Sequence, residues 1–362
     1  MIALTEAATL HPLVLPARAD AADAGDLLDY ARVRNASLLE TTGRDDEHLE
    51  PDALLALLRS DADLERRQWS VVEDGETIGV AVLNVVADGG GRTAYVTINL
   101  LQRTWGRGLG TVVLAQIEKT AKEAGVRKLL LWTEHTDRGE VRLDSPTGFG
   151  SVPRDHHHAR FLLRHGFALE QVERVSVLEL SEESTRRVTA LHDAAARMAD
   201  GYRVVQWTLP TPPAHVDGYA RMKQRMSTDV PDAELDMPEE NWDAERVARH
   251  DARHLDRGNT VLVTAAQHVA TGELCAFNEL AIGRRADETT HQEDTLVLSS
   301  HRGHRLGLLV KTAGLLSWRT QHPLSPQVIT FNAEENRPML NINEAIGFVP
   351  VAYEGAWRKD LP

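Results

Sequence analysis

The sequence predicts an α/β fold of the α+β type in which one architecture is used twice. Each of two tandem domains is expected to hold a mixed, mostly antiparallel sheet flanked by helices. The order of strand and helix patterns in residues 13–180 recurs in residues 202–348, and a repeated order of elements is typical of a duplicated domain. The chain of 362 residues is also long enough for two hydrophobic cores.

The first half is expected to open with a short apolar strand at 13–15 and an amphipathic helix at 20–39, for which Asp20 is a candidate cap. A second helix is expected at 52–64 because four leucines form an apolar stripe there. Runs rich in β-branched residues, separated by Gly-containing turns, then indicate an antiparallel meander of three strands. A helix, a buried strand, another helix and a last strand follow. In chain order, these seven elements are expected at 69–73, 78–86, 93–101, 108–125, 128–133, 156–165 and 176–180.

The second half repeats this order after a linking helix at 184–199, which Asp200 and Gly201 end. Its strands are expected at 202–209, 260–265, 273–282, 289–298 and 327–331, and its helices at 216–226, 243–255, 306–320 and 337–345. We therefore expect an N-terminal domain at 1–183, a linking helix at 184–201 and a C-terminal domain at 202–362.

Composition excludes several classes of protein. Forty Lys and Arg face 54 Asp and Glu, a formal charge of −14, which disfavours a nucleic-acid partner. No run of residues is long and apolar enough for a membrane span, and no basic segment precedes an apolar one at the start. The one cysteine, Cys275, allows no internal disulfide and no thiolate cluster, so we expect a cytoplasmic protein without a metal site. The cluster His156-His157-His158 is a weak metal candidate because consecutive helical residues point in different directions.

Two Gly-rich turns stand at matching points, each between a strand and a long helix. They comprise residues 105–110 and 302–307. Glycines let the backbone approach a ligand, and the helix start adds partial positive charge, so such a turn suits a pyrophosphate. Neither turn has the Lys-Ser or Lys-Thr pair of a nucleotide-binding P-loop, and neither follows the first strand of a parallel βαβ unit.

These features resemble the GNAT superfamily of acyl-CoA dependent N-acetyltransferases, whose hallmark is Arg or Gln, then x-x-Gly-x-Gly or Ala, at the start of the central helix. In the second turn Arg302 and Gly307 fit and Arg305 replaces the middle glycine, whereas in the first turn Trp105 replaces the leading residue. The family's helix that begins with Asn and ends in Gly-Phe matches Asn336 through Gly347-Phe348. The stretch 330–336, followed by Met339 and Asn343, looks especially like a group of bacterial GNAT proteins.

The resemblance implies acetyl-CoA, or another short acyl-CoA, as co-substrate, with its pyrophosphate on the amides of the turns and an Asn near the pantetheine arm. The residues implied are Trp105, Gly106, Arg107, Gly108, Leu109, Gly110, Arg302, Gly303, His304, Arg305, Leu306, Gly307, Asn332 and Asn336. In the first half Asp155 takes the place of Asn336, and an ionised carboxylate cannot donate a hydrogen bond.

Many members of the family place a tyrosine seven residues after that Asn to serve the leaving thiolate. Leu162 and Asn343 stand there in this chain, and neither can act as a general acid. For the base we expect carboxylates on the strands before the second Gly-rich turn, namely Glu279, Glu293 and Asp294, since the matching strand of the first half offers Tyr95, Thr97 and Asn99. Chemistry is therefore expected in the C-terminal domain, although each carboxylate could instead lie on a solvated face or in an ion pair.

Two acidic segments, 229–245 and 44–52, are expected to border the acceptor clefts and to attract a cation. Exposed loop charges explain the same segments equally well. The leading hypothesis is acyl transfer to the amine of a small, cationic molecule by a monomer or homodimer. The alternatives are a catalytically silent CoA-binding sensor or scaffold and a protein or peptide N-acetyltransferase.

Overall fold

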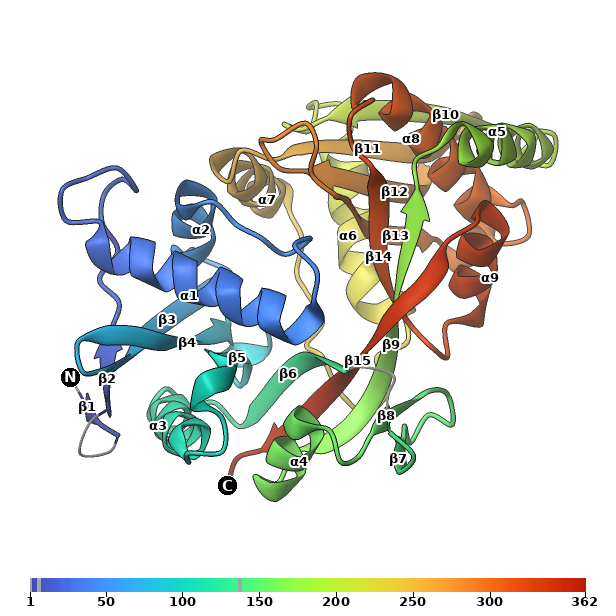
Figure 1. Ribbon diagram of the computed structural model, residues 1–362. Helices are drawn as coiled ribbons and strands as arrows, with labels where there is room; N and C mark the ends of the chain where they lie inside the picture. Colours follow the sequence, from blue (N-terminus) through green and yellow to red (C-terminus); the bar gives the residue numbers. More distant parts are fainter. Residues whose placement is uncertain (1, 5–7, 136–138) are drawn as a thin grey trace.

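The computed structural model describes residues 2–4, 8–135 and 139–362 (Figure 1). Its strands form one continuous thirteen-stranded sheet and a separate two-stranded hairpin. None of the helices in the described ranges has the length and apolar character needed to span a lipid bilayer.

The first half follows the predicted order of elements and adds a hairpin before its last helix. Its elements are β1 (Ile2–Ala3), β2 (Ala8–Pro12), α1 (Gly25–Thr42), α2 (Pro51–Leu58), β3 (Leu64–Glu73), β4 (Glu76–Val86), η1 (Asp88–Gly90), β5 (Thr93–Leu100), η2 (Gln102–Thr104), α3 (Leu109–Glu123), β6 (Lys128–His135), β7 (Arg142–Asp144), β8 (Ser151–Pro153), α4 (His157–Arg164) and β9 (Ala168–Glu179).

The second half repeats that order after the linking helix. Its elements are α5 (Glu182–Ala196), β10 (Tyr202–Thr208), α6 (Val216–Asp229), α7 (Ala244–Asp256), β11 (Thr260–His268), β12 (Leu274–Ile282), β13 (Thr290–Val297), η3 (Ser299–His301), α8 (Leu306–Gln321), β14 (Gln327–Ala333), α9 (Arg337–Ile346) and β15 (Val349–Asp360). The final strand was not anticipated from the sequence.

The antiparallel meander of the first half is confirmed, and its first turn shows why. β3 pairs with β4 and β4 with β5, both antiparallel. Asp74 and Gly75 connect β3 to β4 with φ values of 50° and 83°. Positive φ at both central residues defines a type I′ turn, whose twist matches that of the flanking strands.

Three early expectations were wrong. The first strand is 8–12 rather than 13–15, because burial alternates along Ala8–Pro12 and the ladder with β3 ends at Pro12. The first helix begins at Gly25, and Asp20 instead forms an ion pair with Arg18. The second helix ends at Leu58, where the next residue already has an extended backbone.

The two halves exchange their last strands. β15, at the end of the second half, pairs antiparallel with β6 of the first half, and β9, at the end of the first half, pairs antiparallel with β14 of the second. β9 and β15 also pair with each other. In the order β5-β6-β15-β9-β14-β13, each half's sheet is thus continued by a strand of the other half. The domain limits predicted from the sequence stay a prediction, because the strands cross them.

Candidate functional site

Each half has the same opening in its sheet, between two parallel strands. β5 and β6 pair over only three residues at their starts, and so do β13 and β14. The strands of each pair then continue without further pairing toward the end of the sheet that carries the Gly-rich turn.

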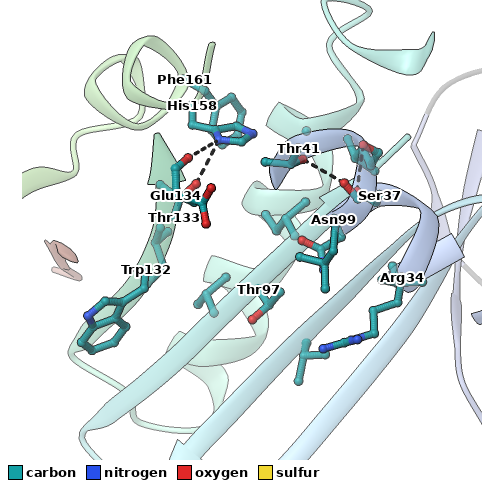
Figure 2. Close-up of a pocket in the computed structure, with 18 of the residues that line it drawn as sticks. Arg34, Ser37, Thr41, Thr97, Asn99, Trp132, Thr133, Glu134, His158 and Phe161 are labelled. Carbon is teal, nitrogen blue, oxygen red and sulfur yellow. Dashed lines mark hydrogen bonds between the residues drawn. The ribbon is translucent and has the colours of Figure 1, made fainter. Parts of the chain in front are cut away.

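In the first half this opening leads into a cavity of about 1070 Å³. Its walls come from α1, the meander, β6, α4 and the first Gly-rich turn, while Phe331 and Glu354 reach it from the second half. Figure 2 shows side chains from four of these elements around it: Arg34, Ser37 and Thr41 of α1, Thr97 and Asn99 of β5, Trp132, Thr133 and Glu134 of β6, and His158 and Phe161 of α4.

The first Gly-rich turn forms one end of the cavity. Gly106 and Gly108 have φ values of 75° and 85°, a region that other residues avoid. A Cβ atom at Gly110 would lie 3.1 Å from Phe161, so glycine there lets α3 approach α4 closely. Gly108 directly precedes α3, whose first N–H groups have no helical partner. The turn therefore offers backbone N–H groups at a helix start, which is an anion-binding arrangement.

Trp105 departs from the usual pattern of this turn, and the structure shows how it serves instead. Its indole Nε1 donates a hydrogen bond to the carbonyl of Leu100 at 2.9 Å. In the second turn Arg302 Nε points at the carbonyl of Val297 at 3.5 Å, also five residues earlier. Trp105 thus connects its turn to the end of β5, as Arg302 connects the other turn to β13. The indole ring of Trp105 also stacks on His157, with 4.1 Å between ring centroids.

Five of the six residues expected to bind a cofactor in the first turn line the cavity. These are Trp105, Gly106, Gly108, Leu109 and Gly110. The exception is Arg107, whose guanidinium pairs with Glu73 of β3 at 2.5 Å. Its backbone remains part of the turn, but its side chain is engaged elsewhere.

A row of three glutamates crosses the sheet near the other end of the cavity. Glu354 of β15 stands directly opposite Glu134 of β6 on one side and opposite Glu173 of β9 on the other. Directly opposed residues project from the same face of a sheet, with Cβ atoms about 5 Å apart. The strand exchange therefore brings carboxyl groups of both halves together.

Only Glu354 in this row lacks a partner. Glu134 accepts two hydrogen bonds from Arg44, at 2.9 and 2.6 Å, and Glu173 accepts one from the indole of Trp132 at 2.6 Å. Among the described residues, none donates a hydrogen bond to the carboxyl of Glu354, which lines the cavity. It is the carboxyl that the structure leaves for a ligand.

Burial and mutual repulsion shift the whole row toward the neutral form. Burial raises the pKa of Glu354 to about 8, with further contributions from Glu173, Glu134 and Glu47. Burial likewise raises the pKa of Glu134 and Glu173 above the ordinary glutamate value. Such shifted carboxyls in a cavity are typical of functional sites.

His158 lines the wall between the two ends. Its Nδ1 lies 3.0 Å from the hydroxyl of Thr133 and 3.4 Å from the carbonyl of Glu134 (Figure 2). Burial lowers the pKa of His158 to about 4, so the ring is neutral at physiological pH. His158 therefore adds a polar, uncharged surface beside β6.

In the second half, the corresponding turn lies outside this cavity. Arg302, Gly303, His304 and Arg305 are exposed, and Leu306 and Gly307 are buried at the start of α8. Arg305 has a φ of 54°, so a non-glycine residue takes the left-handed conformation that Gly108 has in the first half.

The carboxylates expected to be catalytic do not face an open cleft. Lys223 of α6 lies between two of them, 3.3 Å from Glu279 and 2.5 Å from Asp294, and the hydroxyl of Tyr219 also donates to Glu279. Lys223 and Glu279 are both buried. Burial raises the pKa of Glu279, while Asp294 and Glu279 outweigh the effect of burial on Lys223 and raise its pKa. A lysine of the chain thus occupies the place between two carboxylates where an amine ligand was expected.

Glu293, the third expected base, is exposed and lies next to Asp294 on β13. Successive strand residues point to opposite faces. The structure therefore brings Glu279 and Asp294 together and leaves Glu293 apart from them.

The Asn residues of the second half form internal contacts. Asn343 donates to Asn332 at 2.7 Å and accepts from the buried Lys311 at 2.9 Å. Burial lowers the pKa of Lys311 to about 7. Asn336 caps α9 by accepting from the backbone of Met339 at 3.4 Å. None of these residues lines the large cavity.

The two acidic segments differ in position. Arg44 and Glu47 from the segment 44–52 line the cavity, as expected for a border of the cleft. No residue of 229–245 does so. Asp236 in that segment pairs with Lys128 at 2.9 Å and Asp229 with Arg225, so these two acids are held in ion pairs.

Comparisons with known proteins agree with this architecture. Residues 31–149 match the acetyltransferase (GNAT) family. This match covers about a third of the chain and lies in its first half. A tandem GNAT protein from the clavulanic acid biosynthesis pathway has a similar structure, with a TM-score of 0.73, 23% identity and coverage of 98% of each chain. A comparison with curated proteins finds no relative.

Two further solved structures share the fold of this chain over nearly its whole length. A GCN5-related N-acetyltransferase from Sphaerobacter thermophilus has a TM-score of 0.63 at 14% identity, covering 99% of this chain and 97% of its own. The N-myristoyltransferase of Saccharomyces cerevisiae has a TM-score of 0.58 at 10% identity, covering 99% and 81%. Enzymes of the acetyltransferase (GNAT) family, whose model residues 31–149 match, use acyl-CoA as co-substrate.

Sequence reasoning missed Glu134 and Glu354 as site residues. One signal was available: Glu173 and Glu354 each follow the glycine of a Gly-Phe pair, Gly166 and Gly347, by seven residues. The repeat thus marks both glutamates. Their meeting in one row depends on the pairing of β9 with β15, which no local pattern indicates.

Proposed function

We propose that this GNAT protein transfers an acyl group from acyl-CoA to the amine of a small, cationic molecule, and that the transfer takes place in the first half. One observation carries the proposal: a single cavity joins the Gly-rich turn to the glutamate row. A thioester donor and an amine acceptor can meet only where both kinds of subsite share one space.

The donor end is supported by the residues present. The turn at 105–110 offers backbone N–H groups to a pyrophosphate, and Leu114 and Leu162 supply an apolar wall for a pantetheine arm. Leu162 cannot protonate the leaving thiolate, so we propose that the thiolate takes its proton from solvent.

The acceptor end is supported by Glu354. A protonated amine must lose a proton before it attacks the thioester carbonyl, and the unpartnered carboxylate of Glu354 is placed to accept it. The new N–C bond then forms as the C–S bond breaks, the thiolate becomes a thiol, and the second amine proton leaves with solvent. The net products are an amide, free CoA and one proton.

The charge of the row supports a cationic acceptor. The repulsion that raises the pKa of Glu354 is relieved when a positive charge lies beside it. Arg44 forms ion pairs with Glu134 and Asp46, which leaves the carboxylate of Glu354 for a ligand cation. For the second half we propose no chemistry, because Lys223 already fills the place between its carboxylates.

Thiol release from acetyl-CoA, measured with a panel of mono-, di- and polyamines, tests the proposal. We expect Glu354→Gln to lower kcat/KM about 100-fold or more, the usual contribution of a general base. Glu293→Gln, at the exposed carboxylate expected from the sequence, should leave the rate unchanged. A rate that survives Glu354→Gln but falls in Glu293→Gln would return the chemistry to the second half. Acylation confined to basic peptides would favour a peptide acetyltransferase.

A further inference from the structure

Three potential metal ligands converge in the second half, away from the cavity. They are the carboxylate of Glu273, the thiol of Cys275 at the start of β12 and the imidazole of His301 at the end of η3, and their ligand atoms all lie within 4.8 Å of one another. Cys275 is fully buried, and the side chains of Glu273 and His301 are 26% and 15% exposed. The cluster is therefore sheltered but still reachable from solvent.

The ring of His301 is already held in the orientation that a ligand needs. Its Nδ1 lies 2.8 Å from the hydroxyl of Tyr202, while its Nε2 faces Glu273 Oε2 at 3.7 Å. A neutral imidazole that donates from Nδ1 to an oxygen has its lone pair on Nε2, which is the usual arrangement of a metal-bound histidine. Tyr202 thus serves as the outer partner of the ring.

Glu273 is held in a similar way. Its Oε1 pairs with Arg221 at 2.6 Å, which leaves Oε2 facing His301. The thiol of Cys275 donates to the backbone carbonyl of Glu273 at 3.3 Å, so the sulfur lies beside the same residue. His301 and Glu273 are therefore each held by a residue outside the cluster, and the thiol of Cys275 lies against the backbone of Glu273.

We propose that Glu273, Cys275 and His301 form a zinc site in which water completes a four-coordinate shell. One thiolate, one imidazole and one carboxylate are ligands that Zn²⁺ accepts, whereas Mg²⁺ and Ca²⁺ prefer oxygen alone. On binding, the thiol of Cys275 loses its proton to solvent and a sulfur–zinc bond replaces its hydrogen bond. The single cysteine led to the expectation of no metal site. One cysteine excludes a thiolate cluster, but it allows a site of mixed ligands that are distant in sequence.

The site would link β12 to the segment that carries the second Gly-rich turn. His301 directly precedes residues 302–307, which are mostly exposed. A metal that joins His301 to Cys275 and Glu273 therefore fixes the start of this turn against the sheet. The inference is independent of the proposed acyl transfer, because it concerns other residues and another ligand.

Cobalt titration of the full chain tests the proposal directly. Thiolate-bound Co²⁺ absorbs in the near ultraviolet by sulfur-to-metal charge transfer, and the chain has one cysteine, so such a band reports Cys275 alone. We expect the band to saturate at one Co²⁺ per chain and to disappear when one equivalent of Zn²⁺ is added. The absence of a band at saturating Co²⁺ would overturn the proposal.

Variants then assign the other ligands. Cys275→Ser should abolish the band, and His301→Gln and Glu273→Gln should each weaken cobalt binding at least tenfold. Tyr202→Phe should weaken it about tenfold, as outer partners do. His304→Gln, at an exposed histidine three residues after His301, is the matched control and should bind normally. A band of full strength in His301→Gln would overturn the site. The wild-type titration and zinc displacement decide the question even if Cys275→Ser does not fold.

Discussion

The two halves share a backbone plan but differ in what fills the opening between their parallel strands. In the first half Leu114 and Leu162 line a large cavity. Their counterparts in the repeat are Lys311, four residues after the last glycine of its turn, and Asn343, four residues before the Gly-Phe pair. These two bond to each other in the interior. The comparison teaches that one duplicated scaffold can hold either an open site or an internally satisfied polar core.

Separating the halves should have the largest effect. We expect fragment 1–201 to lack cooperative unfolding when expressed alone, because β6 and β9 lose β15 from between them. Circular dichroism with urea denaturation measures this. Mixing it with fragment 202–362 should restore a folded complex. A fragment 1–201 that unfolds cooperatively by itself would show that the strand exchange is dispensable.

Exchanging the counterpart residues comes next. Leu114→Lys should weaken acyl-CoA binding about 100-fold, because a charge without a partner in an apolar wall costs several kcal/mol. The reverse change, Lys311→Leu with Asn343→Leu, should leave affinity unaltered and serves as the matched control. Calorimetry with acetyl-CoA measures both. Binding lost in the second-half double variant and kept in Leu114→Lys would assign the donor site to the second half.

The free energy of unfolding should depend on pH with opposite signs through Glu354 of the first half's cavity and Lys311 of the second half. Glu354 has its pKa raised to about 8, so stability from its neutral form is lost as pH rises from about 4.5 through 8. Lys311 has its pKa lowered to about 7, so stability associated with its neutral form is lost as pH falls from 10.5 through 7. Urea denaturation across pH should lose the first slope in Glu354→Gln and the second in Lys311→Leu.

Glu354 should also determine how the rate of acyl transfer depends on pH. If Glu354 acts as the base, kcat/KM rises about tenfold per pH unit below 8 and then levels off. Glu354→Gln should remove this rise as well as lower the rate. A rise that persists in the variant would assign the titration to another group.

The smallest effect concerns the turns. Arg305→Gly should raise the free energy of unfolding by about 0.5–1 kcal/mol, since glycine adopts the left-handed conformation without strain. Gly108→Ala should lower it by about 1 kcal/mol for the same reason. Opposite signs at matched positions would confirm that the turns share one conformation, whereas a loss of stability in Arg305→Gly would contradict it.

The sequence supported most of the fold because its signals are local. The Asp74-Gly75 turn, the glycines at 106 and 108 and the periodicity of α3 and α8 each specify nearby backbone. Strand exchange is not local: nothing in the residues of β15 states that it will pair with β6. The Gly-rich turn that ends the cavity was therefore found from the sequence, while Glu354 was not.

The sequence led to the expectation of chemistry in the second half for a physical reason. Glu279 and Asp294 are carboxylates on the expected strands, but a sequence does not reveal that Lys223, more than fifty residues away from Glu279 along the chain, will lie between them. Carboxylates near an expected cleft are often already in ion pairs with the protein's own cations. Here the packing of α6 on β12 decides which carboxylates are left unpaired.

The position of β15 also sets an order of events during synthesis. Ribosomes build chains from the N-terminus, and domains generally fold as they emerge. Here the strand between β6 and β9 of the first half is supplied by Val349–Asp360, which follows all the other described strands along the chain. The cavity and its glutamate row are therefore completed only after the second half has been made, so a chain that stops before β15 lacks Glu354 in the cavity wall.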